Sequence, residues 1–133
     1  MKKYLFFIII FAMLLGGCKS LNITDDNKKT LDFTVVERDG IPAELFSVIE
    51  ERKSEAFTMS YSIDGYLYIA VGYGEKSTGG YSIRVDDVYE TDSNLGIHTT
   101  LIGPAAGEAV NKMATYPYVV VKLEYIDKNI IFE

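Results

Sequence analysis

The sequence predicts an α+β domain that is rich in β-structure: a mostly antiparallel curled sheet or small sandwich of about seven strands with one amphipathic helix. Three observations favour this fold class. Alternating apolar and polar residues dominate from Phe57 to Phe132, turn residues separate the alternating segments, and only residues 41–52 follow a helical period. Because strands and helices do not alternate along the chain, a parallel nucleotide-binding sheet is not expected.

The composition predicts one small domain and offers no clear set of residues that would bind a prosthetic group. A chain of 133 residues has room for a single domain, and its 48% of hydrophobic residues is enough to build a core. The formal net charge of −6 disfavours an extensive phosphate-binding surface. One Cys cannot form an internal disulfide, and one His supplies little material for a transition-metal site. We therefore expect no nucleic-acid partner and no cofactor.

The first 18 residues predict export. Lys2 and Lys3 precede an unbroken apolar run from Tyr4 to Leu15. This run is shorter than the roughly 20 apolar residues of a bilayer-spanning helix and is typical of a secretory signal. The string Leu15-Gly16-Gly17-Cys18 resembles the lipobox of bacterial lipoproteins. The resemblance implies cleavage after residue 17 and diacylation of the Cys18 sulfur, with an uncleaved anchor or a free exported thiol as the alternative.

The predicted anchor also predicts the organisation of the rest of the chain. Acyl chains on Cys18 would hold the protein on a membrane, with its domain on the extracytoplasmic side. Residues 18–30 are polar and have no apolar period, so we expect an acylated cysteine followed by a flexible tether. A single β-rich domain is then expected over residues 31–133.

The first half of this domain contains the predicted helix. Residues 31–36 alternate and predict a first strand that ends at the turn Asp39-Gly40. In residues 41–52, Pro42 suits the first turn of a helix. Leu45, Val48 and Ile49 then fall on one helical face, which predicts an amphipathic helix.

From residue 57 onward the period of the apolar residues changes to two. Two alternating segments flank Asp64-Gly65, a pattern typical of a hairpin with a type I′ turn. Gly74 to Gly80 predicts a second turn, and residues 103–115 predict a loop because they contain proline and glycine. The strands are predicted over residues 57–63, 66–73, 81–90, 96–102, 118–125 and 130–132.

No segment contains a convincing catalytic or metal-binding set. Residues 72–77 place a Lys-Ser pair beside glycines, but the spacing differs from that of a P-loop and predicts a hairpin turn. A Ser-His-Asp triad would need His98, and the chain has no G-x-S-x-G motif. Asp86 and Asp87 would point to opposite faces of a strand unless a bulge intervened. The oxygen-rich string at 92–94 does not match a calcium loop, so we expect no metal site and no enzyme.

The tyrosines offer a different kind of candidate site. Tyr66 and Tyr68 share one face of their predicted strand, and the aliphatic residues that alternate with them share the other. If the aliphatic face is the core side, the tyrosine face is exposed, with Tyr81 or Tyr118 beside it. Exposed tyrosine clusters are frequent in protein-contact surfaces. The alternative is a two-sided core in which only the tyrosine hydroxyls reach water.

One string in the second half of the chain carries a family resemblance. Thr78-Gly79-Gly80-Tyr81-Ser82-Ile83, followed by Pro104 and by a Pro-Tyr-Val-Val-Val string from Pro117, resembles the PrcB C-terminal domain. The family is named for a subunit of a bacterial surface protease complex, and the resemblance covers residues 66–123. Gly79 and Gly80 are expected to supply the positive φ of a tight turn. The resemblance implies a non-catalytic lipoprotein that supports an exported protease, and it transfers no active-site residue.

These features predict a membrane-anchored surface lipoprotein that acts as a protein-interaction or stabilising subunit. Its partner would be an exported protease or another surface protein. The alternative is a small-ligand or cell-wall-glycan binding module, which would need an exposed, concave row of tyrosines. The predicted partner-binding surface combines Tyr66, Tyr68, Thr78, Gly79, Gly80 and Tyr81.

Overall fold

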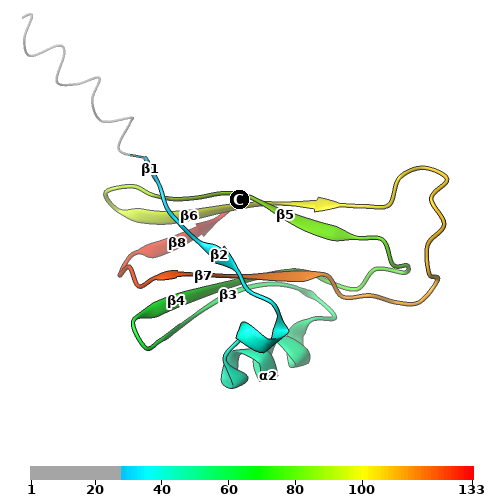
Figure 1. The fold of residues 1–133 in the computed structure, drawn as a ribbon, viewed down its shortest axis with the longest axis horizontal. Helices are drawn as coiled ribbons and strands as arrows, with labels where there is room; N and C mark the ends of the chain where they lie inside the picture. The colour runs from blue at the N-terminus through cyan, green and yellow to red at the C-terminus, as the bar shows by residue number, and fades with distance from the viewer. Residues whose placement is uncertain (1–27) are drawn as a thin grey trace, which may run out of the picture.

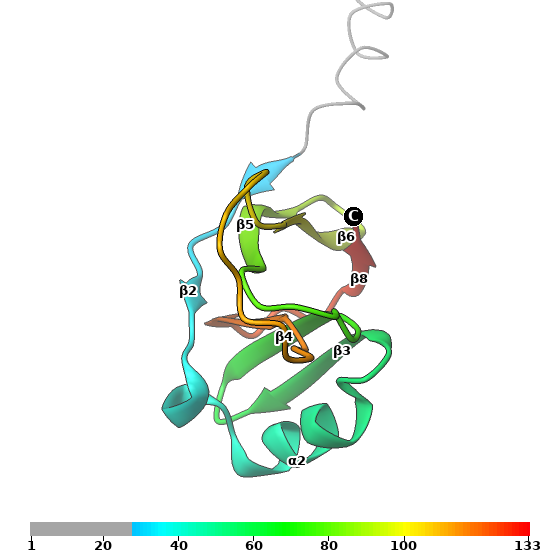
Figure 2. The same ribbon diagram turned by 90° about the vertical axis from the view of Figure 1, so that its right-hand side faces the viewer.

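The computed structural model describes residues 28–133, so the predicted leader, Cys18 and most of the predicted tether lie outside the described residues. Two four-stranded sheets lie face to face, and one helix covers the outer face of one of them (Figure 1, Figure 2). The predicted fold class is confirmed, in the form of a small sandwich. Within residues 28–133, no helix combines the length and the apolar character needed to cross a bilayer.

The first sheet has the strand order β1-β5-β6-β8. These strands span Lys29–Thr30, Ser82–Glu90, Asn94–Ile102 and Asn129–Phe132. Its neighbours are antiparallel except β6 and β8, which run parallel. β1 is formed by the last two residues of the segment expected to be a tether, and it pairs with the end of β5.

The second sheet has the strand order β2-β7-β4-β3 and is antiparallel throughout. Its strands span Thr34–Val35, Tyr118–Glu124, Tyr66–Tyr73 and Ala56–Ile63. The predicted first strand over residues 31–36 is reduced to the short β2. The physical reason is that β1 pairs in the first sheet and β2 in the second, so residues 31–33 must cross between them.

Helix α2, Ala43–Arg52, follows a 3-10 turn, η2, at Arg38–Gly40. Its buried residues are Leu45 and Ile49, at 3% and 0% exposure, as expected for one apolar stripe. Pro42 immediately precedes the first helical residue, where a missing N–H costs no helical hydrogen bond. The helix therefore covers the second sheet with the face that the sequence predicts.

The hairpin of β3 and β4 is formed as its sequence predicts. The two residues of its turn, Asp64 and Gly65, have φ values of 54° and 81°, which are typical of a type I′ turn. Ile63 lies opposite Tyr66, and the pairing continues without interruption to Ala56 opposite Tyr73.

Two hydrophobic cores result, one on each face of the second sheet. The sandwich core lies between the two sheets, and the helix-side core lies between the second sheet and α2. The sandwich core contains Leu67, Ile69, Val71, Val88, Leu95, Ile97, Val119, Val121 and Leu123. The helix-side core contains Ile41, Leu45, Ile49, Tyr68, Ala70 and Val120.

This double coverage corrects the expectation of an exposed tyrosine face. Tyr68 is only 7% exposed because α2 covers its side of the sheet, whereas Tyr66, at the strand end, is 41% exposed. The alternative of a two-sided core is therefore correct at Tyr68. The segment Tyr66–Tyr73 contains no charged residue, and such a continuous, mainly apolar run is typical of a strand buried on both faces.

Candidate functional site

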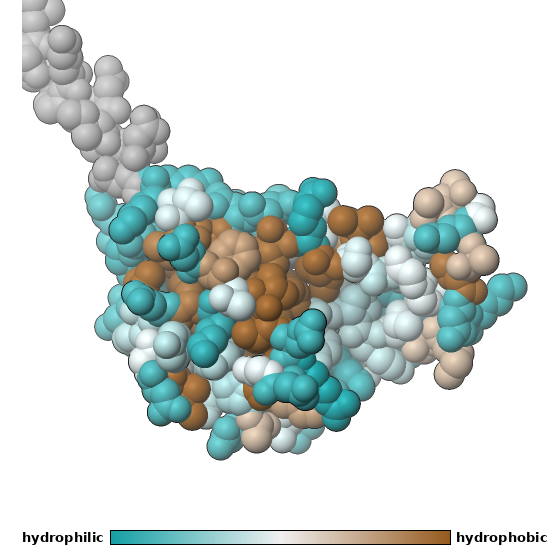
Figure 3. Space-filling view, in the orientation of Figure 1, coloured by the Kyte–Doolittle hydropathy of each residue, from teal (hydrophilic) through white to brown (hydrophobic). Residues whose placement is uncertain are grey.

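Two loops project together from one end of the sandwich, and we name this unit the two-loop arm (Figure 1). Its first loop, residues 74–81, joins β4 to β5, and its second loop, residues 103–117, joins β6 to β7. The space-filling view shows the arm standing out from the body, with hydrophilic and hydrophobic residues mixed over its surface (Figure 3). The predicted residues Thr78, Gly79, Gly80 and Tyr81 all lie in the first loop.

Backbone hydrogen bonds join the two loops of the arm. Lys76 and Thr115 exchange two of them, with N···O distances of 2.8 and 2.9 Å. Nearer the tip, the amide of Gly79 donates to the carbonyl of Asn111 at 2.8 Å. The arm is therefore a paired structure, although its loops are far apart in sequence.

Side chains add two further links between the loops. The hydroxyl of Thr115 donates to the carbonyl oxygen of Thr78 at 2.7 Å. The hydroxyl of Tyr116 donates to the carboxylate of Glu75 at 3.1 Å. The hydrogen bond to this carboxylate raises the pKa of the Tyr116 phenol above its ordinary value.

Gly80 is required at its position for two reasons. Its φ is +89°, a left-handed conformation that side chains other than glycine rarely adopt. A Cβ at this position would also lie 2.9 Å from Val110 Cγ1 and 3.0 Å from Pro104 Cβ. Gly79 has no such φ, and its Cβ would meet Asn111 at an ordinary 3.7 Å. The expectation of positive φ is therefore confirmed at Gly80 and wrong at Gly79.

Tyr81 closes the base of the arm. It is half-buried, and its Cε1 would lie 3.3 Å from a Cβ placed on Gly103 in the second loop. The carbonyl of Thr78 accepts a hydrogen bond from Thr115, the absence of a side chain at Gly80 allows the second loop to pack closely, and the ring of Tyr81 packs near Gly103. The string that carries the family resemblance thus holds the two loops together.

The second loop of the arm leaves apolar atoms in solvent. Glu108 and Ala105 form a small turn, in which the amide of Glu108 donates to the Ala105 carbonyl at 3.0 Å. Met113 is 67% exposed, the largest value among the exposed large hydrophobic residues described. An unbranched methionine adapts its shape to many partner surfaces. The other exposed apolar residues of this loop are Ala105, Ala106, Ala109 and Ala114.

The structure does not bring Tyr66 and Tyr68, the two predicted site tyrosines of β4, to the arm. Tyr66 lies at the hairpin end of β4 and Tyr73 lies at the arm end. The length of the strand places these two residues about 24 Å apart. The ammonium of Lys122 lies 4.0 Å from the ring centroid of Tyr66 and 5.8 Å from that of Tyr68. Tyr66 and the arm are therefore two separate surfaces, and Tyr68 belongs to the core.

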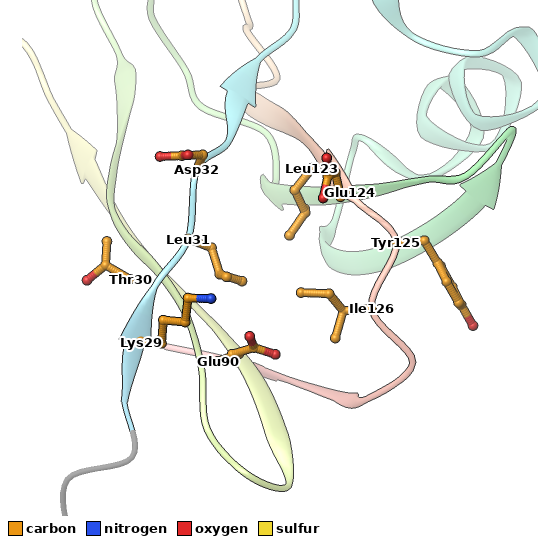
Figure 4. A pocket seen from close by; sticks show the side chains of 9 residues that line it. All are labelled: Lys29, Thr30, Leu31, Asp32, Glu90, Leu123, Glu124, Tyr125 and Ile126. Carbon is orange, nitrogen blue, oxygen red and sulfur yellow. The ribbon is translucent and has the colours of Figure 1, made fainter.

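A cavity of about 430 Å³ opens at the end of the sandwich opposite the arm (Figure 4). Leu31, Leu123 and Ile126 point toward one another across it, and Tyr125 points away. This is not the row of stacked tyrosines that the ligand-binding alternative requires. The polar residues around it are Lys29, Thr30, Asp32, Glu90 and Glu124.

A polar cluster on the first sheet surrounds Asp86. A β-bulge between Val85 and Asp87 interrupts the pairing with β6 at this residue. The Asp86 carboxylate accepts from Thr100 Oγ1 at 2.5 Å and pairs with Arg84 Nε at 2.5 Å. These two contacts, that of Thr100 first, hold the pKa of the Asp86 carboxyl below its ordinary value.

The contacts of this cluster differ in order from those of a catalytic triad. His98 Nδ1 lies 2.8 Å from Asp86 Oδ2, but the Thr100 hydroxyl donates to the carboxylate and not to the imidazole. The sequence could not place these residues together, because the bulge has no clear local signature. Within residues 28–133, no group of three or more His, Cys, Asp or Glu side chains is arranged to hold a metal ion.

The comparisons with known proteins give one match. A family model described as PrcB C-terminal matches residues 67–124, which confirms the resemblance predicted from the sequence. No curated protein and no solved structure matches. The matched segment runs from β4 to the last residue of β7 and so includes both loops of the arm. Residues 67–124 of the chain are therefore similar to the PrcB C-terminal family.

Proposed function

We propose that this protein is a non-catalytic surface lipoprotein that binds and stabilises an exported protease through its two-loop arm. The observation that carries this proposal is the position of the arm. The segment that matches the family contains both loops of the arm, and residues of the string Thr78–Tyr81 hold these loops together. The family name points to a protease complex, and the arm is the part of the domain that projects farthest.

The chemistry of the arm suits a protein contact. Its interior contacts are backbone hydrogen bonds, which give a defined shape without a large core of its own. Its second loop offers Met113 and several alanines, whose burial against a partner is favourable because it removes apolar area from water. A projecting arm also reaches a partner without exposing the sandwich core.

Lipid on Cys18 would complete this function. Two or more acyl chains anchor a protein stably, and an anchored subunit meets an anchored or secreted partner at a raised effective concentration. The chain is acidic, with a net charge of −6, so attraction to anionic headgroups would not hold it on the membrane.

The test is affinity capture from native membranes with the full-length chain. We expect an exported protease to co-purify in stoichiometric amount and to be identified by mass spectrometry and by an active-site probe. Met113→Asp should lower its recovery about tenfold or more, because it places a charge in the buried part of the contact. Cys18→Ala should remove the chain from the membrane fraction.

The matched control is Tyr125→Asp, since Tyr125 is 51% exposed and lies outside the arm. If Met113→Asp and Tyr125→Asp recovered equal amounts of the protease, the assignment of the arm as the binding surface would be contradicted. Recovery of only lipid or wall fragments by the wild-type chain would contradict the protease partner.

A further inference from the structure

β3 forms an edge of the second sheet, with β4 as its one neighbouring strand. Ile63 and Tyr66 flank the two-residue turn, so their backbone groups bond to each other. In an antiparallel ladder this arrangement repeats at every second residue. The backbone groups of Thr58, Ser60 and Ser62 therefore point away from β4, toward the open edge.

This edge lacks the devices that usually prevent one strand from pairing with another. β3 is eight residues long, contains no charged residue and no proline, and pairs with β4 without a bulge. The opposite edge of the same sheet, β2, has only two residues. The longest edge strand in the described part of the molecule is thus the least protected.

The side chains of β3 form two rows of different character. Phe57, Met59, Tyr61 and Ile63 face the helix-side core and are only half-buried. The row on the other face is small, polar and exposed, and it consists of Thr58, Ser60 and Ser62. On the face of β3 that is turned toward α2, part of the apolar side-chain surface therefore remains exposed to solvent along the edge.

We propose that β3 pairs antiparallel with β3 of a second copy of this chain, about a twofold axis at Ser60. In this register Met59 lies opposite Tyr61 and Phe57 lies opposite Ile63 of the partner copy. Thr58 lies opposite Ser62, and the two Ser60 residues exchange backbone hydrogen bonds. Every apolar side chain thus meets an apolar one, and every small polar side chain meets another.

Other registers fit less well. A slip that moves each residue to the opposite face would place apolar side chains beside polar ones. The two nearest registers that keep the faces are centred on Met59 and on Tyr61. The first would place Glu55 opposite Ile63, and the second would place Asp64 opposite Thr58. With Ser60 at the centre, no charged residue lies opposite a residue between 57 and 63. Because the whole chain is acidic, this uncharged edge lets two copies meet with little repulsion.

The twofold axis also gives a consistent placement of the two chains. In an extended sheet it runs perpendicular to the sheet, so both α2 helices lie on one side and both first sheets on the other. β1 lies on the side away from α2 (Figure 1, Figure 2). The first strands of both chains would therefore lie on the same side of the dimer. Two anchors in one membrane need this arrangement, a point that rests on the proposed anchoring, whereas the pairing itself does not.

The first test is disulfide cross-linking of the full-length chain in membranes. Residues directly opposite in a hydrogen-bonded antiparallel pair have Cα atoms about 5.5 Å apart, within the range of a disulfide. Ser60→Cys should therefore give a linked dimer on a non-reducing gel. The controls are Ser82→Cys, an exposed serine of β5, and the wild-type chain, whose single cysteine is Cys18.

The register is tested with a second pair of variants. Thr58→Cys and Ser62→Cys should cross-link when both chains are expressed together, and neither should do so alone. Cross-linking of Ser60→Cys no greater than that of Ser82→Cys would overturn the dimer. Self-cross-linking of Thr58→Cys as efficient as that of Ser60→Cys would overturn the register.

A variant without cysteine chemistry gives an independent readout. Ser60→Lys places two positive charges opposite each other at the axis, so the detergent-solubilised full-length chain should change from two copies to one by light scattering. Ser82→Lys should leave two copies, and a wild-type chain of one copy would overturn the proposal. Met113→Asp should leave the dimer intact, which separates failure of this inference from failure of the proposed arm.

Discussion

The second sheet and the two-loop arm are parts of one domain, but different forces hold them. In the sheet, Ile69 and Val121 are fully buried, and apolar cores cover both faces. In the arm, paired backbone groups such as those of Lys76 and Thr115 and the left-handed Gly80 define the shape. Burial is favourable in proportion to apolar area, whereas a single hydrogen bond contributes little net free energy.

The sheet therefore contributes most of the stability of the domain, whereas the arm contributes a defined surface shape. A substitution in the sheet should act on the folding of the whole domain. A substitution in the arm should change local shape and binding while the body stays folded.

The largest effect is expected from Tyr68→Ala. Removing this core side chain should lower the free energy of unfolding by about 3–5 kcal/mol, because it leaves a cavity between the sheet and α2. Tyr66→Ala should cost about 1 kcal/mol or less, since Tyr66 is exposed and loses only a ring contact with Lys122. Urea denaturation measures both. Equal losses would mean that the face of β4 toward α2 is not a core.

The next effect is expected at the glycines of the arm. Gly80→Ala should lower the free energy of unfolding, or of local opening of the arm, by about 1–3 kcal/mol, because φ is positive and Val110 and Pro104 are close. Gly79→Ala is the matched control and should be nearly neutral. Hydrogen exchange at the amides of the arm distinguishes local from global opening. A larger effect at Gly79 would contradict the geometry.

A smaller effect is expected from one side-chain hydrogen bond. Thr115→Val keeps the shape of the side chain but removes the donor to the Thr78 carbonyl, which should cost about 0.5–1.5 kcal/mol. Ser77→Ala, an exposed change in the same arm, should have little effect. Thermal unfolding of the two variants measures the difference. No loss in Thr115→Val would show that the backbone pairs alone hold the loops.

The smallest effect is a dependence on pH. The Asp86 carboxyl has a lowered pKa in the folded state, chiefly through the Thr100 hydroxyl, so the folded state binds its proton less readily than the unfolded state. Its contribution is present above the unfolded pKa and is lost as the pH falls through the folded pKa. Asp86→Asn should therefore make stability fall less steeply between neutral and acid pH. Asp39→Asn, an exposed change on η2, is the comparison, and equal slopes for wild type and Asp86→Asn would contradict this account.

Local patterns in the sequence were sufficient for the helix and for the strands from β3 onward, but not for the short strands β1 and β2. Asp64-Gly65 between alternating segments specified the hairpin turn, and the spacing of Leu45 and Ile49 specified the buried stripe of α2. These signals are reliable because they depend on residues within a few positions of one another. The resemblance carried by Thr78–Ile83 was likewise readable from the sequence, since it lies in one continuous string.

Contacts between distant segments could not be read in this way. The burial of Tyr68 depends on α2, from which the whole strand β3 separates it in sequence, and the bulge at Asp86 depends on the pairing with β6. The separation of Tyr66 from the arm follows from the length of β4 and from the loops that meet at its far end.

The strands from β3 onward, the helix, the hairpin turn and the similarity of residues 67–124 to the PrcB C-terminal family could all be read from the sequence, because they follow from short-range periodicity, backbone preferences and one continuous string. The covered face of β4, the joining of the two loops into the arm and the open edge at β3 became visible only in the folded structure. The physical reason is that burial and strand pairing are properties of two surfaces together. A local pattern shows that a face is apolar, but not what covers it.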